Sequence, residues 1–257
     1  MKEDKKVLRF TTKNTEKFKM LVNALVGVVN EVALMSNDEG ITCSSIDSAN
    51  VAHISFDWRK EDFEEYESPA GGHKFVVQLE KLKQSLKRAK ASDLLNVEVG
   101  HSTMQLVLDD GATKRTFQLG IIGDNNSTKP LPSLTFKSKV ILPSEKWIIG
   151  VEDVAEIGTS CSIKAEEGLF SIQTWNDNKV QTTKIDYRDG EAGTELHSEV
   201  YGDGSTGKYS VEYLKHFLEP AKKTDGLVLE WSKDYPCRIT YELENLTIRY
   251  VLAPRIE

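Results

Sequence analysis

The stretch Gly120–Phe136, GIIGDNNSTKPLPSLTF, is the point from which the rest of the chain can be ordered. Glycine, asparagine and proline recur in it, and these residues interrupt regular secondary structure. A stretch this long without a helix or strand is uncommon inside a compact domain and is often a functional loop or a linker. It lies near the middle of the 257 residues, and the patterns before and after it resemble each other. We interpret it as a connector between two copies of one unit, with an ordinary surface loop as the alternative.

Outward from the connector, the sequence predicts four rounds of short strands, each with one amphipathic helix. Apolar residues recur at helical spacing in four segments, which begin near Asn14, Leu79, Ser144 and Val211; the second runs to Ala89 and the fourth to Ala221. Alternation of apolar and polar residues predicts the strands. The main ones are 7–11, 32–35, 41–46, 51–58, 75–77, 95–99, 104–108, 114–120, 138–142, 227–231, 237–243 and 246–252.

The two halves also match each other directly. VALMSNDEGITCSSIDSANVAHISFDWR ends at Arg59, and CSIKAEEGLFSIQTWNDNKVQTTKIDYR ends at Arg188. Gly40 matches Gly168, and the offset is 128 residues at the glycine and 129 at the arginine. A nearly constant offset is the signature of an internal repeat, and one helix per round can cover one face of a small sheet. We therefore predict a duplicated α+β fold of two similar domains with two βαβββ units each: 1–119, the connector 120–136, and 137–257.

Composition sets the broad class of the protein. Hydrophobic residues make up 39%, charged residues 28%, and the net charge is -7, which disfavours non-specific nucleic-acid binding by the whole surface. No apolar run approaches the ~20 residues that span a bilayer, and the N-terminus lacks the apolar core of a secretion signal. The cysteines are widely spaced, which disfavours a disulfide framework and fits a reducing compartment. We expect an intracellular protein without membrane contact.

Sequence motifs give no positive sign of catalysis. Gly202–Lys208 matches most of a phosphate-binding loop, but Tyr209 stands where such a loop needs Ser or Thr to hold magnesium, and the preceding segment 194–200 is polar. A glycine-rich hairpin or loop is the preferred interpretation. The five histidines are scattered, and none has metal-ligand spacing. We expect no catalytic residues, no metal and no cofactor.

Basic residues gather on the outward faces of three of the predicted helices. Clustered basic residues on an otherwise acidic chain can form a surface that faces phosphates, although an ordinary solvated face is the alternative for any one helix. The candidates are Lys19, then Lys81, Lys87 and Arg88, and then Lys215, Lys222 and Lys223. The third helix departs from this pattern, because its outward positions are Glu145, Ile149, Glu152 and Asp153.

At these residues the chain resembles a known family, the sliding clamps of the proliferating cell nuclear antigen (PCNA) type. The resemblance covers the whole chain, and its most specific points are Asn30-Glu31, Ile46-Asp47-Ser48, Leu131-Pro132 in the connector, and the C-terminal LAPRIE, residues 252–257. The C-terminal run resembles archaeal members more than animal ones. The resemblance implies a closed ring of three identical subunits, with helices lining a hole around duplex DNA and sheets forming the outer wall.

The family's activity, carried over, is that of a non-enzymatic processivity factor in DNA replication and repair. Such a ring tethers DNA polymerase, flap endonuclease and ligase, which bind through short peptide motifs, and it is opened by a clamp loader. The lysines on the lining would then attract phosphates without regard to sequence. The resemblance also pairs the edge strands of neighbouring subunits, with Phe117, Leu119, Val180 and Ile185 as the apolar candidates.

The resemblance further implies a pocket under the connector in which client peptides insert apolar and aromatic anchors. Core packing is the alternative role for each matched residue. The matched residues are Ile46, Val51, His53, Leu131, Pro132, Phe136, Tyr235, Pro236, Val251, Ala253, Pro254 and Ile256. Asn50 and Val251 depart from residues common in relatives, which puts the choice of clients in doubt.

Two other functions stay open at this stage. The uneven basic lining motivates a subunit of a heterotrimeric clamp, either replicative or checkpoint-like, which would not close a ring alone. A duplicated α+β enzyme that binds a nucleotide at Gly202–Lys208 is the alternative from another class.

Overall fold

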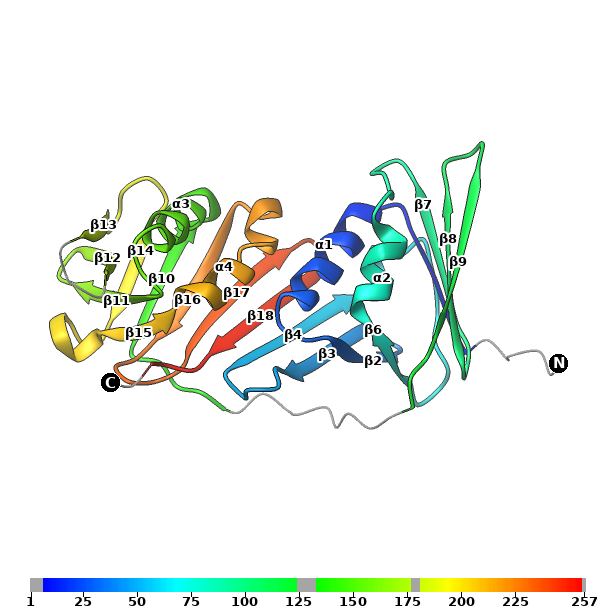
Figure 1. The fold of residues 1–257 in the computed structure, drawn as a ribbon, viewed down its shortest axis with the longest axis horizontal. Helices are drawn as coiled ribbons and strands as arrows, with labels where there is room; N and C mark the ends of the chain where they lie inside the picture. Colours follow the sequence, from blue (N-terminus) through cyan, green and yellow to red (C-terminus); the bar gives the residue numbers. More distant parts are fainter. Residues whose placement is uncertain (1–6, 124–132, 177–180, 256–257) are drawn as a thin grey trace. The chain divides into compact units, whose positions relative to one another are not determined.

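The computed structural model describes residues 7–123, 133–176 and 181–255. Within them the chain forms two compact units, each drawn in Figure 1 as helices packed beside sheets. The first unit contains the chain up to Ile46, the chain from Ile54 to the connector, and Glu244–Thr247. The second contains Asp47–His53, the chain from the connector to Leu243, and the run from Ile248. Each unit therefore includes a short segment from the other part of the sequence.

The first unit places two helices beside two groups of antiparallel strands. The helices are α1 (Thr15–Val26) and α2 (Leu79–Leu86), and the strand orders are β5-β1-β7-β8-β9 and β4-β3-β2-β6. The strands are β1 (Leu8–Thr12), β2 (Glu31–Asn37), β3 (Gly40–Ile46), β4 (Ala52–Arg59), β5 (Glu65–Glu67), β6 (His73–Gln78), β7 (Leu94–Val99), β8 (Thr103–Asp109) and β9 (Lys114–Gly120). A 3-10 turn, η1, spans Lys60–Asp62.

The second unit repeats this order of elements. Its helices are α3 (Ser144–Ala155) and α4 (Val211–His216), and its strand orders are β14-β10-β16-β17-β18 and β13-β12-β11-β15. The strands are β10 (Ser138–Pro143), β11 (Ser160–Glu166), β12 (Leu169–Trp175), β13 (Thr182–Arg188), β14 (Glu195–Ser198), β15 (Gly207–Ser210), β16 (Gly226–Trp231), β17 (Cys237–Leu243) and β18 (Leu246–Leu252). Two 3-10 turns are η2 (Gly202–Ser205) and η3 (Pro220–Lys223). The mixed helix and strand content confirms the predicted α+β class.

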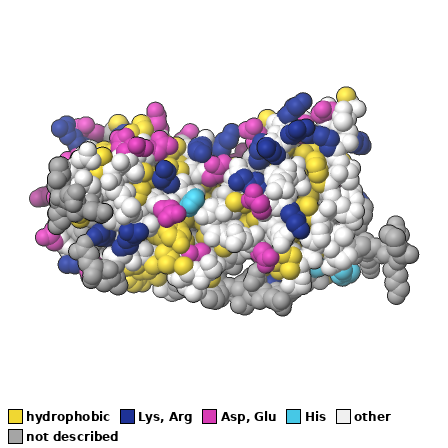
Figure 2. Space-filling model, viewed as in Figure 1, with side chains coloured by type: hydrophobic (Ala, Val, Ile, Leu, Met, Phe, Trp, Pro, Cys, Tyr) yellow, Lys and Arg dark blue, Asp and Glu magenta, His cyan; other side chains and the backbone are white. Residues whose placement is uncertain are grey.

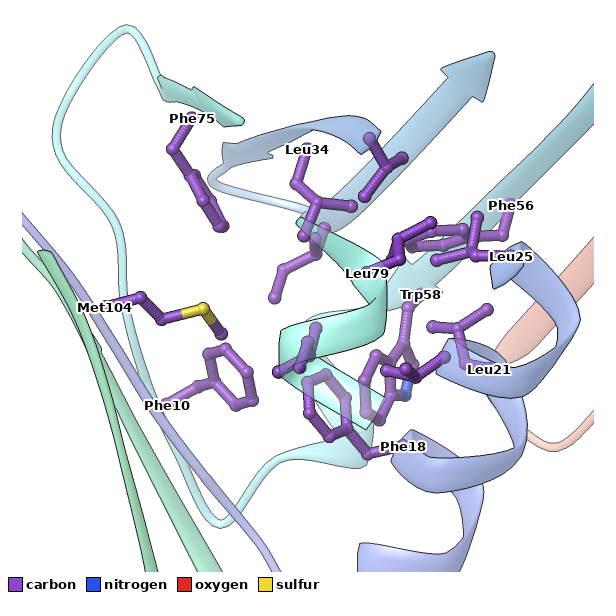
Figure 3. Close-up of a pocket in the computed structure, with 14 residues that line it drawn as sticks. Phe10, Phe18, Leu21, Leu25, Leu34, Phe56, Trp58, Phe75, Leu79 and Met104 are labelled. Carbon is purple, nitrogen blue, oxygen red and sulfur yellow. The ribbon is translucent and has the colours of Figure 1, made fainter. Parts of the chain in front are cut away.

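An aromatic cluster holds the helices of the first unit against its sheets. Phe18 of α1 stacks on Trp58 of β4 with ring centroids 5.8 Å apart, and Phe10 of β1 meets Phe18 edge-on at 6.1 Å. Figure 3 shows these rings and Leu79 of α2 around a small apolar cavity of about 20 Å³. Full burial of a large apolar side chain contributes about 1.5–3 kcal/mol. The core therefore fixes which faces of α1 and α2 look outward.

The two matched glycines both adopt a backbone conformation that favours glycine. Gly40 begins β3 with φ +144°, and a Cβ there would lie 2.1 Å from the carbonyl oxygen of Trp58. Gly168 turns the chain between β11 and β12 with φ +71°. A side chain at either position would be strained, and at Gly40 it would also collide with β4. Both matched positions therefore have a positive φ, although the two angles differ and a side chain would collide with β4 at Gly40 alone of the two.

Some predicted elements were wrong in extent, and three strands were missed. α2 ends at Leu86 rather than Ala89, where the amide of Ala89 instead donates to the carbonyl oxygen of Leu86 in a tighter turn. α4 ends at His216 rather than Ala221, because the chain tightens before Pro220, which has no amide hydrogen to donate. The missed strands β5, β14 and β15 are short and polar, so their alternation is weak.

We examined the described residues for disulfide bonds, metal-binding clusters and membrane-spanning helices. Cys43, Cys161 and Cys237 are buried free thiols, and burial raises the pKa of Cys43 and of Cys161 to about 12. Among the described residues, no cluster of three His, Cys, Asp or Glu side chains is arranged to hold a metal ion. None of the described helices has the length and apolar character required to traverse a bilayer.

Candidate nucleic-acid and partner surfaces

A basic groove runs between α1 and α2 in the first unit. It has a volume of about 440 Å³, and we call it the helix groove. Its lining comprises Lys19, Val22, Asn23, Glu80, Lys83, Gln84, Leu86 and Lys87. Figure 2 shows Lys and Arg side chains gathered over this helix pair. With three lysines against one glutamate, the groove carries the local positive charge that phosphate contacts need.

The structure brings together some of the predicted DNA-facing residues of this unit. Lys19 donates from Nζ to the carbonyl oxygen of Lys87 at 3.4 Å, which joins the two helices at the groove. Lys81, Lys87 and Arg88 are exposed, although Lys87 and Arg88 lie just past the last helical residue. Lys83 was not among the residues predicted from the sequence, yet it lines the groove. Its position in the sequence, beside the apolar stripe of α2, could have indicated this role.

In the second unit, the three lysines predicted to lie on one helix are divided between α4 and the turn η3. Lys215 is exposed on α4, as expected. Lys222 and Lys223 do not continue that helix, because they lie on η3 after the chain has turned at Pro220. The Nζ of Lys222 also forms an ion pair with Glu219 at 2.9 Å, which offsets part of its charge. The positive charge of these three lysines is thus divided between a helix and a separate turn.

The outward face of α3 is acidic, as the helical spacing predicted. Glu145, Ile149, Glu152 and Asp153 are exposed, and 50% of the Ile149 side chain is accessible. Figure 2 shows acidic side chains gathered over this helix. Lys146, the basic residue of α3, directs its Nζ to the hydroxyl of Thr194 at 3.3 Å. A phosphate backbone that approached α3 would therefore meet negative charge.

Most of the described residues predicted for the client pocket lie in the second unit, close to the C-terminal run. Val51 accepts a hydrogen bond at its carbonyl oxygen from the amide of Ala253 at 2.8 Å. The rings of Phe136 and Tyr235 lie 6.0 Å apart, and the guanidinium of Arg238 lies 4.9 Å from the Phe136 ring. We call the half-buried residues of this region the anchor cluster: Val51, Phe136, Tyr235, Pro236, Ala253 and Pro254. Figure 2 shows apolar side chains gathered near the end of β18.

Other predicted pocket residues do not form this surface. His53 and Val251 are buried, with 5% and 7% of their surface exposed, so they offer little surface to a ligand. Ile46 is half-buried at the end of β3 and belongs to the first unit. Leu131, Pro132 and Ile256 lie outside the described residues.

A carboxylate that sequence reasoning missed holds Val51 in place. One oxygen of Asp47, Oδ1, accepts the amides of Val51 at 2.7 Å and of Ala52 at 3.0 Å. The other, Oδ2, accepts the hydroxyl of Tyr213 on α4 at 2.7 Å. This bond, with burial second, raises the pKa of Tyr213 to about 12. The 166 residues between the two partners leave no local pattern that could reveal the contact.

The strands predicted to join neighbouring subunits both lie at sheet edges. β9 ends the order β5-β1-β7-β8-β9, and β13 ends the order β13-β12-β11-β15. Phe117 and Leu119 on β9, and Ile185 on β13, are half-buried. Val180 lies outside the described residues. An edge strand presents backbone groups that can pair with another chain.

Gly202–Lys208 does not have the architecture of a phosphate-binding loop. The segment forms η2 and then enters strand β15, whereas such a loop leads into the N-terminus of a helix. The Ser205 hydroxyl is engaged with both backbone groups of Ala165, and Lys164 pairs with Asp203 at 3.2 Å. The segment is a structural turn, as the preferred interpretation held.

Comparison with known proteins places this architecture in a family. Residues 7–122 match the model of the N-terminal domain of proliferating cell nuclear antigen. A DNA polymerase sliding clamp of Nitrosopumilus maritimus is 28% identical, over 96% of this chain and 97% of that protein. One of Methanococcus maripaludis strain C6 is 26% identical, over 96% of this chain and 98% of that protein.

Solved structures share the fold. The proliferating cellular nuclear antigen of Entamoeba histolytica superposes with a TM-score of 0.88 at 17% identity, over 98% of this chain and 100% of that one. The PCNA of Thermococcus kodakaraensis gives 0.88 at 18% identity, over 97% and 100%. These matches confirm the duplicated clamp fold. The family-model match over residues 7–122 and the archaeal relatives along nearly the whole chain support a sliding clamp of the PCNA family.

Proposed function

We propose that this chain is a subunit of a DNA sliding clamp that encircles duplex DNA and tethers DNA polymerase. The helix groove is the observation that carries the proposal, because it concentrates lysines on an otherwise acidic protein. Such a surface attracts phosphates regardless of sequence, which suits sliding. The similar proteins of the two archaea are named DNA polymerase sliding clamps, which supports the same function.

We infer that three copies of this chain close the ring. Strands β9 and β13 each stand at the edge of a separate sheet and carry half-buried apolar residues, so β9 of one copy can pair with β13 of the next. A head-to-tail contact of this kind either closes or continues into a fibre. On this proposal the boundaries 1–119, 120–136 and 137–257 describe two repeats and their connector. A heterotrimer is not needed to explain the described residues.

The anchor cluster is proposed to receive short peptide motifs of client proteins. Its half-buried prolines and aromatic rings offer apolar contacts at the surface, and Arg238 adds a cation beside Phe136. We assign to it the polymerase, flap endonuclease and ligase clients and the clamp loader that the resemblance implied. The protein would act inside the cell, where the DNA is, and would carry out no chemistry of its own.

The first test of this function is topological. Rings assembled from concentrated subunits around a circular plasmid are expected to resist a high-salt wash during gel filtration, because a closed ring cannot dissociate sideways. Cutting the same plasmid once is expected to release them from the DNA ends. Equal release from circular and linear DNA would contradict encirclement, and retention on both would indicate ordinary binding.

The acidic face of α3 gives a second prediction. The double variant Glu152→Lys/Asp153→Lys is expected to bind linear duplex DNA about three- to tenfold more tightly at low salt, because up to two new phosphate contacts form. The slope of log affinity against log salt should steepen by about 0.9 for each new contact. Fluorescence anisotropy over a salt series measures both quantities.

The matched control for this experiment is Glu191→Lys/Glu195→Lys. It makes the same charge change at exposed residues next to and on β14, outside helix α3 itself. Its salt slope should equal that of the unmodified protein. If both double variants gain affinity equally, net charge rather than α3 controls DNA binding.

A further inference from the structure

A second groove in the second unit is not accounted for by DNA binding or by the anchor cluster. It lies along β10 and β14 and has a volume of about 510 Å³, and we call it the β14 groove. Its lining comprises Phe136, Lys137, Ser138, Lys139, Leu196, His197, Ser198, Glu199, Tyr201 and Glu230. Strand pairing sets Lys139 opposite His197 on one side and opposite Glu230 on the other, so these side chains form a row across three strands.

The charge of this groove is not balanced within the described residues. Glu230 is already neutralised, because it accepts the Nε and Nη2 of Arg238 at 2.7 Å each. Among the described residues, the side chains of Lys137, Lys139 and His197 make no ion pair or hydrogen bond. Glu199 is the remaining acid of the lining. The groove therefore offers two lysines and a histidine to a ligand that carries carboxylates.

The groove also has apolar contacts at two places. Tyr201 is 49% exposed, and only Ile149 joins it as an exposed large apolar side chain in the described part of the chain. Phe136 lines the groove and also belongs to the anchor cluster, where it meets Tyr235. The β14 groove is thus continuous with the surface proposed to hold client peptides.

The backbone of β14 limits how a peptide could bind beside this strand. The amide of Leu196, on β14, already donates to the Oδ1 of Asp189 at 2.8 Å. A further strand therefore cannot pair freely along the outer edge of β14. The open surface is the face that carries Lys139 and His197, so side chains rather than backbone hydrogen bonds would hold the ligand there.

We propose that the β14 groove binds an acidic, extended flank of a client peptide whose apolar motif is held by the anchor cluster. Aspartate or glutamate side chains of the flank pair with Lys137, Lys139 and His197, and the chain of the flank packs against Tyr201. This proposal rests on the proposed function, because it extends the same client site. It gives this clamp a means to prefer clients that carry negative charge beside the motif.

The test uses two synthetic peptides with one shared apolar and aromatic motif. One peptide carries a flank of alternating Glu and Ser, and the other carries Gln in place of Glu; each flank is placed in turn on either side of the motif. The acidic flank on one side is expected to improve binding about three- to tenfold at low salt, as two or three exposed ion pairs would. Fluorescence anisotropy measures the dissociation constants.

Variants then locate the effect. Lys137→Glu/Lys139→Glu should abolish the advantage of the acidic flank and leave the Gln peptide unchanged. The matched control Lys13→Glu/Lys60→Glu, the same charge change at exposed residues of the first unit, should keep the advantage. Thermal unfolding confirms that each variant is folded. If the acidic and Gln peptides bind the unmodified protein equally, or if the advantage survives in the double variant, the groove proposal is wrong while the clamp function stands. If neither peptide binds, the client site and the groove that extends it are both wrong, and DNA retention tests encirclement separately.

Discussion

Replacing Ile185 with aspartate is expected to convert a ring of three subunits into monomers. Ile185 lies in the middle of edge strand β13, opposite Ile172 of β12, and its side chain is half-buried before any partner arrives. Pairing with β9 of another copy would bury it further. A carboxylate in that position would lose its hydration without gaining a partner, which costs several kcal/mol at each of the three interfaces. Light scattering over a dilution series measures the change in mass.

The proposed head-to-tail contact can be tested further by mixing two variants that are each altered in a different strand of the contact. Phe117→Asp alters β9, the other strand of the proposed contact, and should also give monomers. A mixture of the two monomeric variants retains one intact pair of edges, so it should form dimers and stop there. Ile149→Asp, on the exposed face of α3, is the control and should leave the trimer intact. Trimers in all three variants would show that the subunits join elsewhere.

The second large effect concerns stability, and it arises from a buried ion pair in the first unit. Lys17 of α1 is 8% exposed, and its Nζ donates to both oxygens of Asp62, at 2.7 and 2.8 Å. It also donates to the carbonyl oxygen of Glu244 at 2.8 Å. The indole nitrogen of Trp58 donates to Asp62 at 2.6 Å. The carboxylate is therefore held by two donors that are themselves enclosed by the core.

Lys17→Met is expected to lower the free energy of unfolding by about 3–5 kcal/mol, because it leaves the charge of Asp62 buried without its cation. Urea titration followed by circular dichroism measures the loss. Lys13→Met is the matched control, since the ion pair of Lys13 with Glu64 has similar length, 2.8 Å, but lies at the surface. Its loss should change stability by about 0–1 kcal/mol.

A double variant separates the two possible causes of that loss. In Lys17→Met/Asp62→Leu the buried charge is gone along with its partner, so much of the lost stability should return. If the double variant is as unstable as Lys17→Met, the lost packing, the lost hydrogen bond to Glu244 or the buried Trp58 indole left without its acceptor accounts for that result instead.

The sequence predicted correctly those helices and strands in which apolar residues recur at a regular spacing. Phe18, Leu21 and Leu25 recur at helical spacing because α1 buries one face, and the same spacing found the acidic outward face of α3. The short strand β14 was missed because Leu196 is its single buried residue, which leaves no alternation to detect. The fourth helix was predicted to be longer than it is. Phe217 and Ala221 are buried although they lie in turns after α4, and their spacing is the same as in a continued helix.

Some residues of the candidate surfaces could be predicted from the sequence, and others could not. Lysines on helix faces were predictable, since exposure follows from the position of the apolar stripe. The contact of Asp47 with Tyr213 and that of Lys17 with Asp62 were not, because each joins segments that are distant in sequence. The β14 groove was equally hidden, because Lys139 and His197 become neighbours only through strand pairing.

The exchange of short segments between the two units has a consequence for cooperativity. Asp47–His53 completes the second unit, and Glu244–Thr247 completes the first. Neither unit can melt alone without withdrawing a piece that the other one needs, here the segment held by Asp47 and the turn held by Lys17. We therefore expect the two halves of this duplicated chain to unfold in one cooperative transition rather than one after the other.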